Sequence, residues 1–118
     1  MSRAKQKGTS AETAVVNYLN ENGFSVERRA LQGSKDRGDI NGVPNTVIEV
    51  KAGKNYRIPE WLKETEQERI NDDASLGILV VKPVGKGVGS VQEWWAIVPL
   101  STIVTLLKEN GHVERLRP

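Results

Sequence analysis

The stretch GDINGVPNTVIEVKA, residues 38–52, carries the clearest structural pattern of this chain. Its Pro44-Asn45 pair is typical of a turn between two strands. The flanking residues are rich in Val and Ile and alternate with polar ones, which predicts short strands at 39–43 and 46–51. We therefore expect a β-hairpin here.

Three charged residues of this hairpin form the pattern D-x9-E-x-K: Asp39, Glu49 and Lys51. Since side chains alternate along a strand, Glu49 and Lys51 share one face. A turn of three or five residues would place Asp39 opposite Glu49 on that face, whereas a two-residue turn would place it opposite Val50 and on the other face. A joint site therefore requires a turn with an odd number of residues.

Outward from the hairpin, hydrophobic periodicity and breaker residues divide the remaining chain into helices and strands. We expect helices at 9–22, 60–73 and 101–110 and further strands at 24–30, 76–82 and 91–100. Ser101 is expected to cap the last helix. A helix between two strands implies one parallel crossover. The whole chain, residues 1–118, is thus predicted to form a single α/β domain with a five-stranded mixed sheet flanked by helices.

The composition excludes several kinds of chemistry. The 118 residues include no Cys and a single His, His112, which is predicted to lie on the surface. This rules out disulfides, thiolate nucleophiles, iron–sulfur clusters and zinc sites built from Cys or several His. Catalysis, if present, must rely on carboxylates, Lys, Arg and hydroxyl groups.

Charge is distributed unevenly along the chain. Residues 1–54 hold nine Lys or Arg and six Asp or Glu, whereas residues 55–118 hold eight and nine. A basic first half favours a polyanionic partner. Residues 1–8 are expected to form a flexible basic arm. No apolar run approaches the roughly 20 residues that span a bilayer, and no signal peptide is evident, so we expect no membrane partner and a cytoplasmic protein.

The paired carboxylates of the hairpin predict a metal site. Two carboxylates side by side repel each other unless a cation lies between them, and an all-oxygen ligand set favours Mg²⁺, with Mn²⁺ as a substitute. Lys51 could hold an attacking water or neutralise charge on a phosphate. Glu12 is a candidate further ligand, although its position three residues after Thr9 equally fits a helix capping box.

The same residues resemble a known family. Gly38-Asp39, the run IEVK at 48–51 and a preceding helix that carries Glu12 look like the PD-(D/E)XK nuclease superfamily, with Gly38 where the motif has Pro. The segments KGTSAETAVVNYLNENGFSVERR, QGSKDRGDI and VIEVKAG are similar to the archaeal and phage Holliday junction resolvases. The similarity covers the first half of the chain, and the second half only by its order of helices and strands.

This resemblance implies a restriction-endonuclease-like core and a role for each site residue. It assigns metal binding and catalysis to Asp39, Glu49, Lys51 and Glu12. It also implies that the main-chain carbonyl of Val50 is a metal ligand and that Gln67, on the second helix, lies near the site.

Basic and hydroxyl side chains near this site are candidates for DNA phosphate contacts, although each could equally lie in a solvated loop. These candidates are Arg29, Ser34, Lys35, Arg37, Lys54 and Arg57, together with Arg3, Lys5 and Lys7 in the N-terminal arm. Trp94 and Trp95 must face opposite ways on a strand, so one belongs to the core and the other to a dimer interface or a base-stacking surface.

We expect a Mg²⁺-dependent, structure-selective DNA endonuclease, a Holliday junction resolvase acting on branched double-stranded DNA with no small-molecule cofactor. Symmetric cleavage of a four-way junction needs two active sites and hence a homodimer. The alternatives are another small PD-(D/E)XK nuclease specific for flaps, ends or short sites, and a non-catalytic DNA-binding protein of the same fold. A nucleotide-binding module built on GKGVG, residues 85–89, is a further alternative, but that segment lacks the full phosphate-loop spacing.

Overall fold

The computed structural model describes residues 3–30 and 37–113. Three α-helices, five strands and a 3₁₀ helix follow one another along the chain. The order is α1 (Arg3–Glu21), β1 (Glu27–Arg28), β2 (Ile40–Asn41), β3 (Thr46–Ala52), α2 (Ile58–Asn71), β4 (Leu76–Lys82), η1 (Val88–Glu93), β5 (Trp95–Ile97) and α3 (Leu100–Glu109). No helix in this part of the chain has the length and apolar character needed to cross a bilayer.

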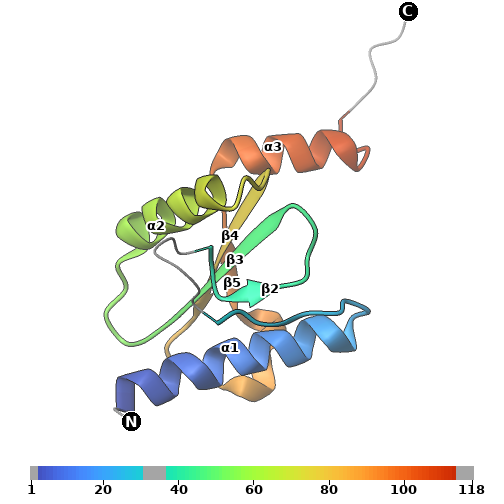
Figure 1. Ribbon diagram of the computed structural model, residues 1–118. Coiled ribbons are helices and arrows are strands. Elements are labelled where there is room, and N and C mark those ends of the chain that lie inside the picture. The colour runs from blue at the N-terminus through green and yellow to red at the C-terminus, as the bar shows by residue number, and fades with distance from the viewer. Residues whose placement is uncertain (1–2, 31–36, 114–118) are drawn as a thin grey trace, which may run out of the picture.

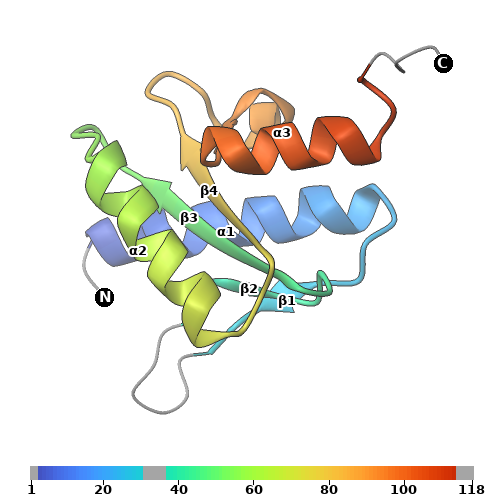
Figure 2. The same cartoon turned by 90° about the horizontal axis from the view of Figure 1, so that it is seen from above.

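All five strands form one sheet in the order β1-β2-β3-β4-β5. β3 and β4 are parallel and are joined through α2, whereas the other three neighbouring pairs are antiparallel. The predicted α/β class and five-stranded mixed sheet flanked by helices are therefore confirmed. Figures 1 and 2 show α1 on one side of the sheet and α2 and α3 on the other.

Side chains from the two faces of β3 build the two layers of the core. Ile48 and Val50 join Ile40 of β2 and pack with Ala11 and Val15 of α1. The opposite face is covered by α2. Gly77 of β4 lies directly under that helix, since a Cβ there would be 3.3 Å from the Cβ of Arg69 and 3.5 Å from the Thr65 Cγ2. Thus Glu49, whose side chain alternates with those of Ile48 and Val50, points to the α2 side.

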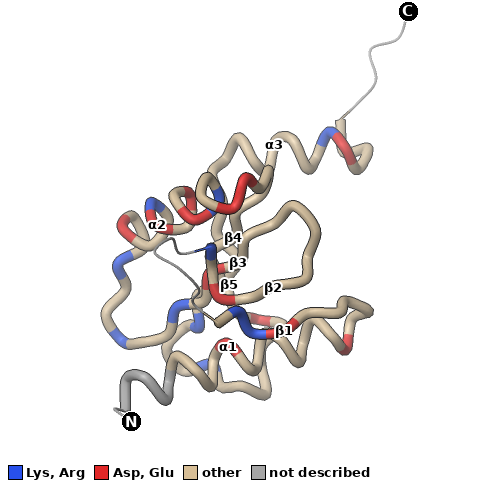
Figure 3. Tube along the Cα trace, viewed as in Figure 1, with Lys and Arg blue, Asp and Glu red and all other residues tan. Residues whose placement is uncertain are grey.

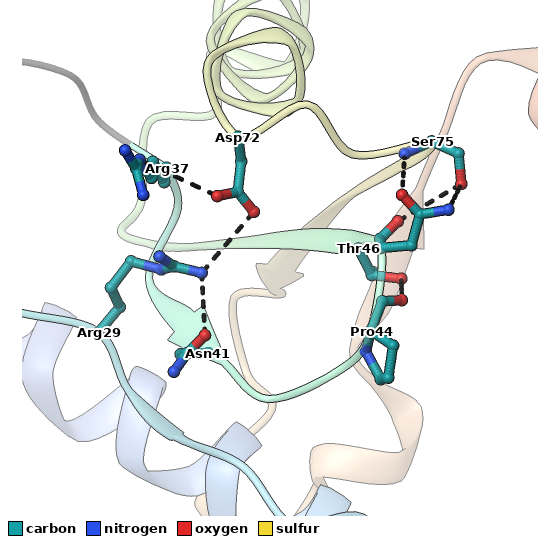
Figure 4. A network of polar contacts seen from close by, with 8 residues as sticks. Arg29, Arg37, Asn41, Pro44, Thr46, Asp72 and Ser75 are labelled. Carbon is teal, nitrogen blue, oxygen red and sulfur yellow. Dashed lines mark hydrogen bonds and ion pairs between the residues drawn. The ribbon is translucent and has the colours of Figure 1, made fainter.

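The hairpin has the register that a joint site requires. Ile40 pairs with Ile48, which leaves seven residues between the two partners and so an odd number. Continuing this pairing by one residue places Asp39 beside Glu49 on the same face. The turn is held against the start of β4, because the side-chain oxygen of Asn45 accepts a 3.0 Å hydrogen bond from the Ser75 N–H. Figure 4 shows Ser75 beside the Pro44–Thr46 turn.

The first helix begins earlier than predicted, at Arg3 instead of residue 9. The expectation of a flexible arm over residues 1–8 is therefore wrong for residues 3–8, and residues 1–2 lie outside the described part. Ala4, Lys5, Gln6 and Lys7 are strong helix formers, and their summed propensity extends the helix through Gly8. Thr9 is consequently inside the helix and is not an N-cap, so the capping-box alternative for Glu12 is wrong.

Three of the predicted strands are shorter than expected. Only residues 27–28 and 40–41 pair within the segments 24–30 and 39–43, and the segment 91–100 contributes only β5. The first residues of the segment 91–100 belong to the 3₁₀ helix η1. Trp94 ends this helix, and its N–H donates to the Val91 carbonyl over 3.0 Å. In the preceding GKGVG segment, Lys86 bonds Glu93 at 2.9 Å.

The last two helices also shift slightly from their predicted bounds. α2 begins two residues early, with a Pro in its first turn, and ends at Asn71. Pro99 occupies the N-cap of α3 and no side chain caps it, so the predicted capping role of Ser101 is wrong. A proline at that position fixes the backbone angle before the helix without needing a side-chain acceptor.

Candidate active site

Asp39 is held by three hydrogen bonds at the end of β2. Its N–H donates to the Ile48 carbonyl over 2.9 Å, and its carbonyl accepts from the Arg29 N–H over 2.7 Å. Its carboxylate Oδ2 accepts the N–H of Val50 over 2.8 Å. The side chain thus occupies the position of the next main-chain acceptor in the ladder between β2 and β3. This arrangement fixes the carboxylate beside the middle of β3.

The residue before Asp39 must be glycine for this geometry. Gly38 has a φ of +94°, and a Cβ there would lie 2.8 Å from the Val47 Cγ1 and 3.1 Å from the Ile48 carbonyl oxygen. A side chain would therefore push the chain away from β3. Glycine at position 38 therefore lets the chain lie close against β3.

A row of carboxylates crosses the site from α1 to α2. The side chain of Glu12 lies near that of Asp39, Asp39 near Glu49, and Glu49 near Glu68 of α2, close enough for each to influence its neighbour's pKa. Glu49 and Glu68 are each only 4% exposed. Acidic side chains from α1, β3, α2 and the residue before β2 therefore lie near one another beside the central strand.

Two basic side chains flank this row. Lys51 Nζ lies 3.1 Å from the Glu64 Oε2 of α2. At the other end, the Arg28 guanidinium binds the Glu12 Oε2, with its Nε at 3.2 Å and its Nη2 at 3.1 Å. The cluster thus has a basic side chain on each side, Arg28 at Glu12 and Lys51 next to Glu49.

The two central carboxyls hold their protons unusually well. Burial raises the pKa of Asp39 to about 8, helped by the hydrogen bond to Glu49 and its negative charge, although the Val50 N–H opposes the shift. Burial likewise raises the pKa of Glu49 to about 8, with a further contribution from Glu68. A carboxyl in such surroundings favours its neutral form, because burial penalises the charged form more than the nearby Lys51 stabilises it.

The pKa values of the flanking groups Glu12 and Lys51 are both raised. Burial and the neighbouring Asp39 raise the pKa of Glu12, while Arg28 acts against this. Burial lowers the pKa of Lys51, but the hydrogen bond to Glu64 and the charges of Glu49 and Glu64 outweigh it, so that its pKa is raised overall. Lys51 is therefore a cation at neutral pH.

The donor set suits a hard divalent cation. Within the described ranges, no three His, Cys, Asp or Glu side chains are grouped as ligands of one metal ion. Mg²⁺ needs only one or two protein carboxylates, because water and substrate phosphates supply its other ligands. A cation bound to Asp39 and Glu49 would replace the protons that neutralise these two carboxylates. Since the N–H and C=O of a strand residue point to the same side, the Val50 carbonyl also faces Asp39.

The structure brings together four of the predicted site residues, Glu12, Asp39, Glu49 and Lys51, but not Gln67. The Gln67 side chain is exposed and donates to the Asn71 Oδ1 over 3.0 Å, one turn along α2. The prediction that Gln67 lies near the site is therefore not supported. Residues 64 and 68, four apart and hence on one side of α2, make the contacts with Lys51 and Glu49.

Sequence reasoning missed Arg28, Glu64 and Glu68. Glu68 is 4% exposed and lies three residues from the fully buried Thr65, so helical spacing places it on the buried side of α2, whereas the Glu64 side chain is 54% exposed. Acidic residues on the buried side of a helix are rare without partners. For Arg28 no comparable signal exists, since a charged residue in a short edge strand is ordinary.

The predicted phosphate-binding residues fall into several groups. Arg29 and Arg37 both reach Asp72, with N···O distances of 3.8 and 3.9 Å, and Arg29 also donates to the Asn41 Oδ1 over 3.1 Å (Figure 4). Lys54 and Arg57 are exposed in the loop from β3 to α2.

The remaining phosphate-binding candidates belong to the start of α1 and to the segment before residue 37. Arg3, Lys5 and Lys7 lie in the first turns of α1, where only the backbone is described, and Ser34 and Lys35 lie outside the described residues. Figure 3 shows acidic positions along α2 and near β2 and β3, with basic positions in the loop that joins β3 to α2. Comparison with models of known protein families finds no match for this chain, and comparison with curated proteins finds none either.

Proposed function

We propose that this protein is a Mg²⁺-dependent DNA endonuclease of the PD-(D/E)XK type that cleaves Holliday junctions. The observation that carries the proposal is the hairpin register, which sets Asp39 beside Glu49 and keeps Lys51 on the face of Glu49. Two adjacent carboxylates, one buried and one partly buried, and one lysine are components that metal-assisted phosphodiester hydrolysis can use. The proposed fold is accordingly the restriction-endonuclease-like core.

Each residue has a defined part in the proposed reaction. Asp39, Glu49 and the Val50 carbonyl would hold the cation, and Glu12 is a further candidate ligand. When bound, Mg²⁺ lowers the pKa of the attacking water and offsets charge on the scissile phosphate. The Lys51 ammonium stabilises the negative charge that builds up on the phosphate during attack. Cleavage would leave a 5′-phosphate and a 3′-hydroxyl, as the resemblance implies.

Glu64 keeps the lysine in place. The 3.1 Å ion pair directs the Lys51 ammonium toward α2 and holds its proton, since its pKa is raised overall. Glu64 is thus proposed as a positioning residue.

Branched DNA is the proposed substrate. A domain of 118 residues has few elements beyond the catalytic core for reading base edges, which favours recognition of shape and backbone. The proposed location of the protein is the cytoplasm.

A homodimer is proposed because a four-way junction has two equivalent strands to cut. The apolar stripe of α3 supports it: Leu100, Ile103, Val104 and Leu107 recur at a spacing of three or four residues and are 39–77% exposed. A neutral helical stripe is self-complementary in a two-fold arrangement, and soluble monomers rarely expose large apolar patches.

Val104→Lys should convert a dimer to monomers in light scattering after size exclusion, whereas Ser101→Lys, outside the stripe, should not. A monomeric wild type would contradict the proposed dimer.

Cleavage of defined DNA structures tests the proposed activity. Wild type, Asp39→Asn and the exposed control Glu21→Gln are incubated with a four-way junction, a flap, a linear duplex and a single strand, with Mg²⁺ or with EDTA. We expect Mg²⁺-dependent cutting of the junction by wild type and Glu21→Gln, and a loss of at least a hundredfold in Asp39→Asn. Equal cutting of the linear duplex would indicate another nuclease specificity. Binding without any cutting would indicate a non-catalytic DNA-binding protein.

A further inference from the structure

An exposed aromatic pair lies on the same sheet face as Lys51. The rings of Tyr56 and Trp95 meet edge to face, with centroids 5.6 Å apart and an interplanar angle of 63°. Tyr56 is 38% and Trp95 44% exposed. An edge-to-face contact uses only part of each ring surface. Aromatic area therefore remains open to a ligand.

The strand register fixes the position of this pair relative to the site. Lys51 of β3 pairs with Val81 of β4, and Val81 pairs with Trp95 of β5. Directly paired residues point to the same face, so Lys51, Val81 and Trp95 form one row across the sheet. With neighbouring strands about 4.8 Å apart, the Cα atoms of Lys51 and Trp95 are separated by about 10 Å.

The loop that carries Tyr56 also carries positive charge. Lys54 and Arg57 flank it within four residues, and both are exposed. Neither forms an ion pair with another residue of the described ranges. The loop itself is anchored, because the Tyr56 hydroxyl accepts the Val84 N–H over 2.6 Å. The aromatic pair is thus rigidly placed and bordered by cations free to contact phosphates.

We propose that Trp95 and Tyr56 form a stacking platform for an unpaired DNA base next to the cleavage site. This inference rests on the proposed nuclease function and specifies its substrate as DNA with an unstacked nucleotide at a branch point. Stacking on aromatic rings together with basic side chains is the usual way in which proteins hold single-stranded DNA. A separation of about 10 Å corresponds to about three nucleotides at the 3.4 Å rise of a duplex strand, and to fewer in an extended strand.

Two features favour a bound base over a purely structural role. A tryptophan that only closes the core would be buried like its neighbour Trp94, which is 8% exposed and donates its Nε1–H to the Gly87 carbonyl over 3.1 Å. The open ring also borders unpaired cations and a phosphate-cleaving site, and that combination fits a nucleotide. An apolar partner would not need Lys54 and Arg57.

Binding in EDTA tests the platform without any cleavage step. The probes are a fluorescent dT12 oligonucleotide and a junction with 2-aminopurine at the branch, and a fully paired duplex is the reference. Wild type should bind dT12 and quench the 2-aminopurine. Trp95→Ala should weaken dT12 binding by about tenfold or more and remove the quenching, whereas Trp95→Phe should retain most of both.

Two further variants separate stacking from other effects. Phe24→Ala removes an aromatic ring of similar exposure, 46%, at the far end of α1, and should change neither signal. Tyr56→Phe keeps the ring but loses the acceptor for the Val84 N–H, so it tests loop anchoring alone. Urea unfolding of each variant verifies that it is folded.

The outcomes distinguish this inference from the nuclease proposal. Equal dT12 binding by Trp95→Ala and wild type, or an equal loss in Phe24→Ala, would overturn the platform while leaving Mg²⁺-dependent cleavage unaffected. A Tyr56→Phe defect as large as that of Trp95→Ala would overturn it in favour of loop anchoring. Conversely, stacking without any cleavage would refute only the nuclease function.

Discussion

Replacing Asp39 by Asn should stabilise the metal-free protein, and the gain should grow as the pH rises. Asn has nearly the same shape, so its Oδ1 can still accept the Val50 N–H that now binds the Asp39 Oδ2 over 2.8 Å. Its amide can donate to the carboxylate of Glu49, which now meets a second carboxyl group. The substitution therefore removes a group that must take up a proton on folding, without removing a hydrogen-bond acceptor.

The pKa values of about 8 for Asp39 and Glu49 set the direction of the pH effect. Between about pH 4 and pH 8 the folded protein keeps a proton that the unfolded chain has released. Because the folded state binds more protons there, its free energy of unfolding falls as the pH rises through this window and levels off above about pH 8. Below about pH 4 both states are protonated and this loss of stability disappears.

The size of the effect follows from the same linkage. One retained proton lowers the free energy of unfolding by about 1.4 kcal/mol per pH unit, or about 2.7 kcal/mol between pH 5.5 and 7.5. Asp39 and Glu49 interact directly and titrate as a pair, so we count one proton and take this value as an upper limit. It is still a large fraction of the roughly 5–15 kcal/mol that stabilises a typical domain.

Urea unfolding in EDTA at pH 5.5 and 7.5 measures this difference for wild type, Asp39→Asn and the control Glu21→Gln. Glu21 is exposed at the end of α1, and its replacement removes the same charge. We expect the advantage of Asp39→Asn over wild type to increase by about 2 kcal/mol between the two pH values, and that of Glu21→Gln to change by less than about 0.5 kcal/mol. An Asp39→Asn advantage that is independent of pH, or a less stable variant at pH 7.5, would refute the reasoning.

Three other predictions concern the metal and the hairpin. Mg²⁺ binding at pH 7 should release about one proton from the paired carboxyls, and titration calorimetry in buffers of different ionisation enthalpy should detect it; binding without release would contradict the assigned ligands. Gly38→Ala should cost about 2–4 kcal/mol in urea unfolding, because φ is +94° and its Cβ would meet the Val47 Cγ1 at 2.8 Å, whereas Gly53→Ala has open space and should cost only the strain of its positive φ. Asn45→Ala should cost about 2 kcal/mol by losing its hydrogen bonds to Ser75 at a φ of 59°, and Asn45→Gly should recover part of this loss.

Local sequence pattern was sufficient to predict β3 and β4, the strands in the middle of the sheet. The apolar run of β4 and the alternation of β3 are strong signals, because these strands are paired on both sides and their buried faces select branched apolar residues. The edge strands were overestimated in length. Pairing at an edge depends on contacts with a single neighbour, and the edge strands β1 and β5 are only two and three residues long; β2, next to the edge, is equally short at two residues.

Part of the candidate site was likewise predictable from local sequence, and part was not. The spacing of Asp39, Glu49 and Lys51 is readable because alternation along a strand and the register of a short hairpin are local properties. Glu64 and Glu68 join the site only because the parallel crossover lays α2 across β3. That packing depends on the chain path over some twenty residues, and helical periodicity alone does not say which strand a helix face will cover.

What the sequence by itself determined about this protein is its α/β class, its hairpin and the chemical character of a site that contains no Cys or His. Only the tertiary structure decided that four carboxylates converge, that Gln67 faces solvent and that Trp95 stands in one row with Lys51. The physical reason is the range of the interactions involved. Propensity and side-chain alternation act over a few residues, whereas the raised pKa values of Asp39 and Glu49 arise from burial that only the packed helices and sheet create.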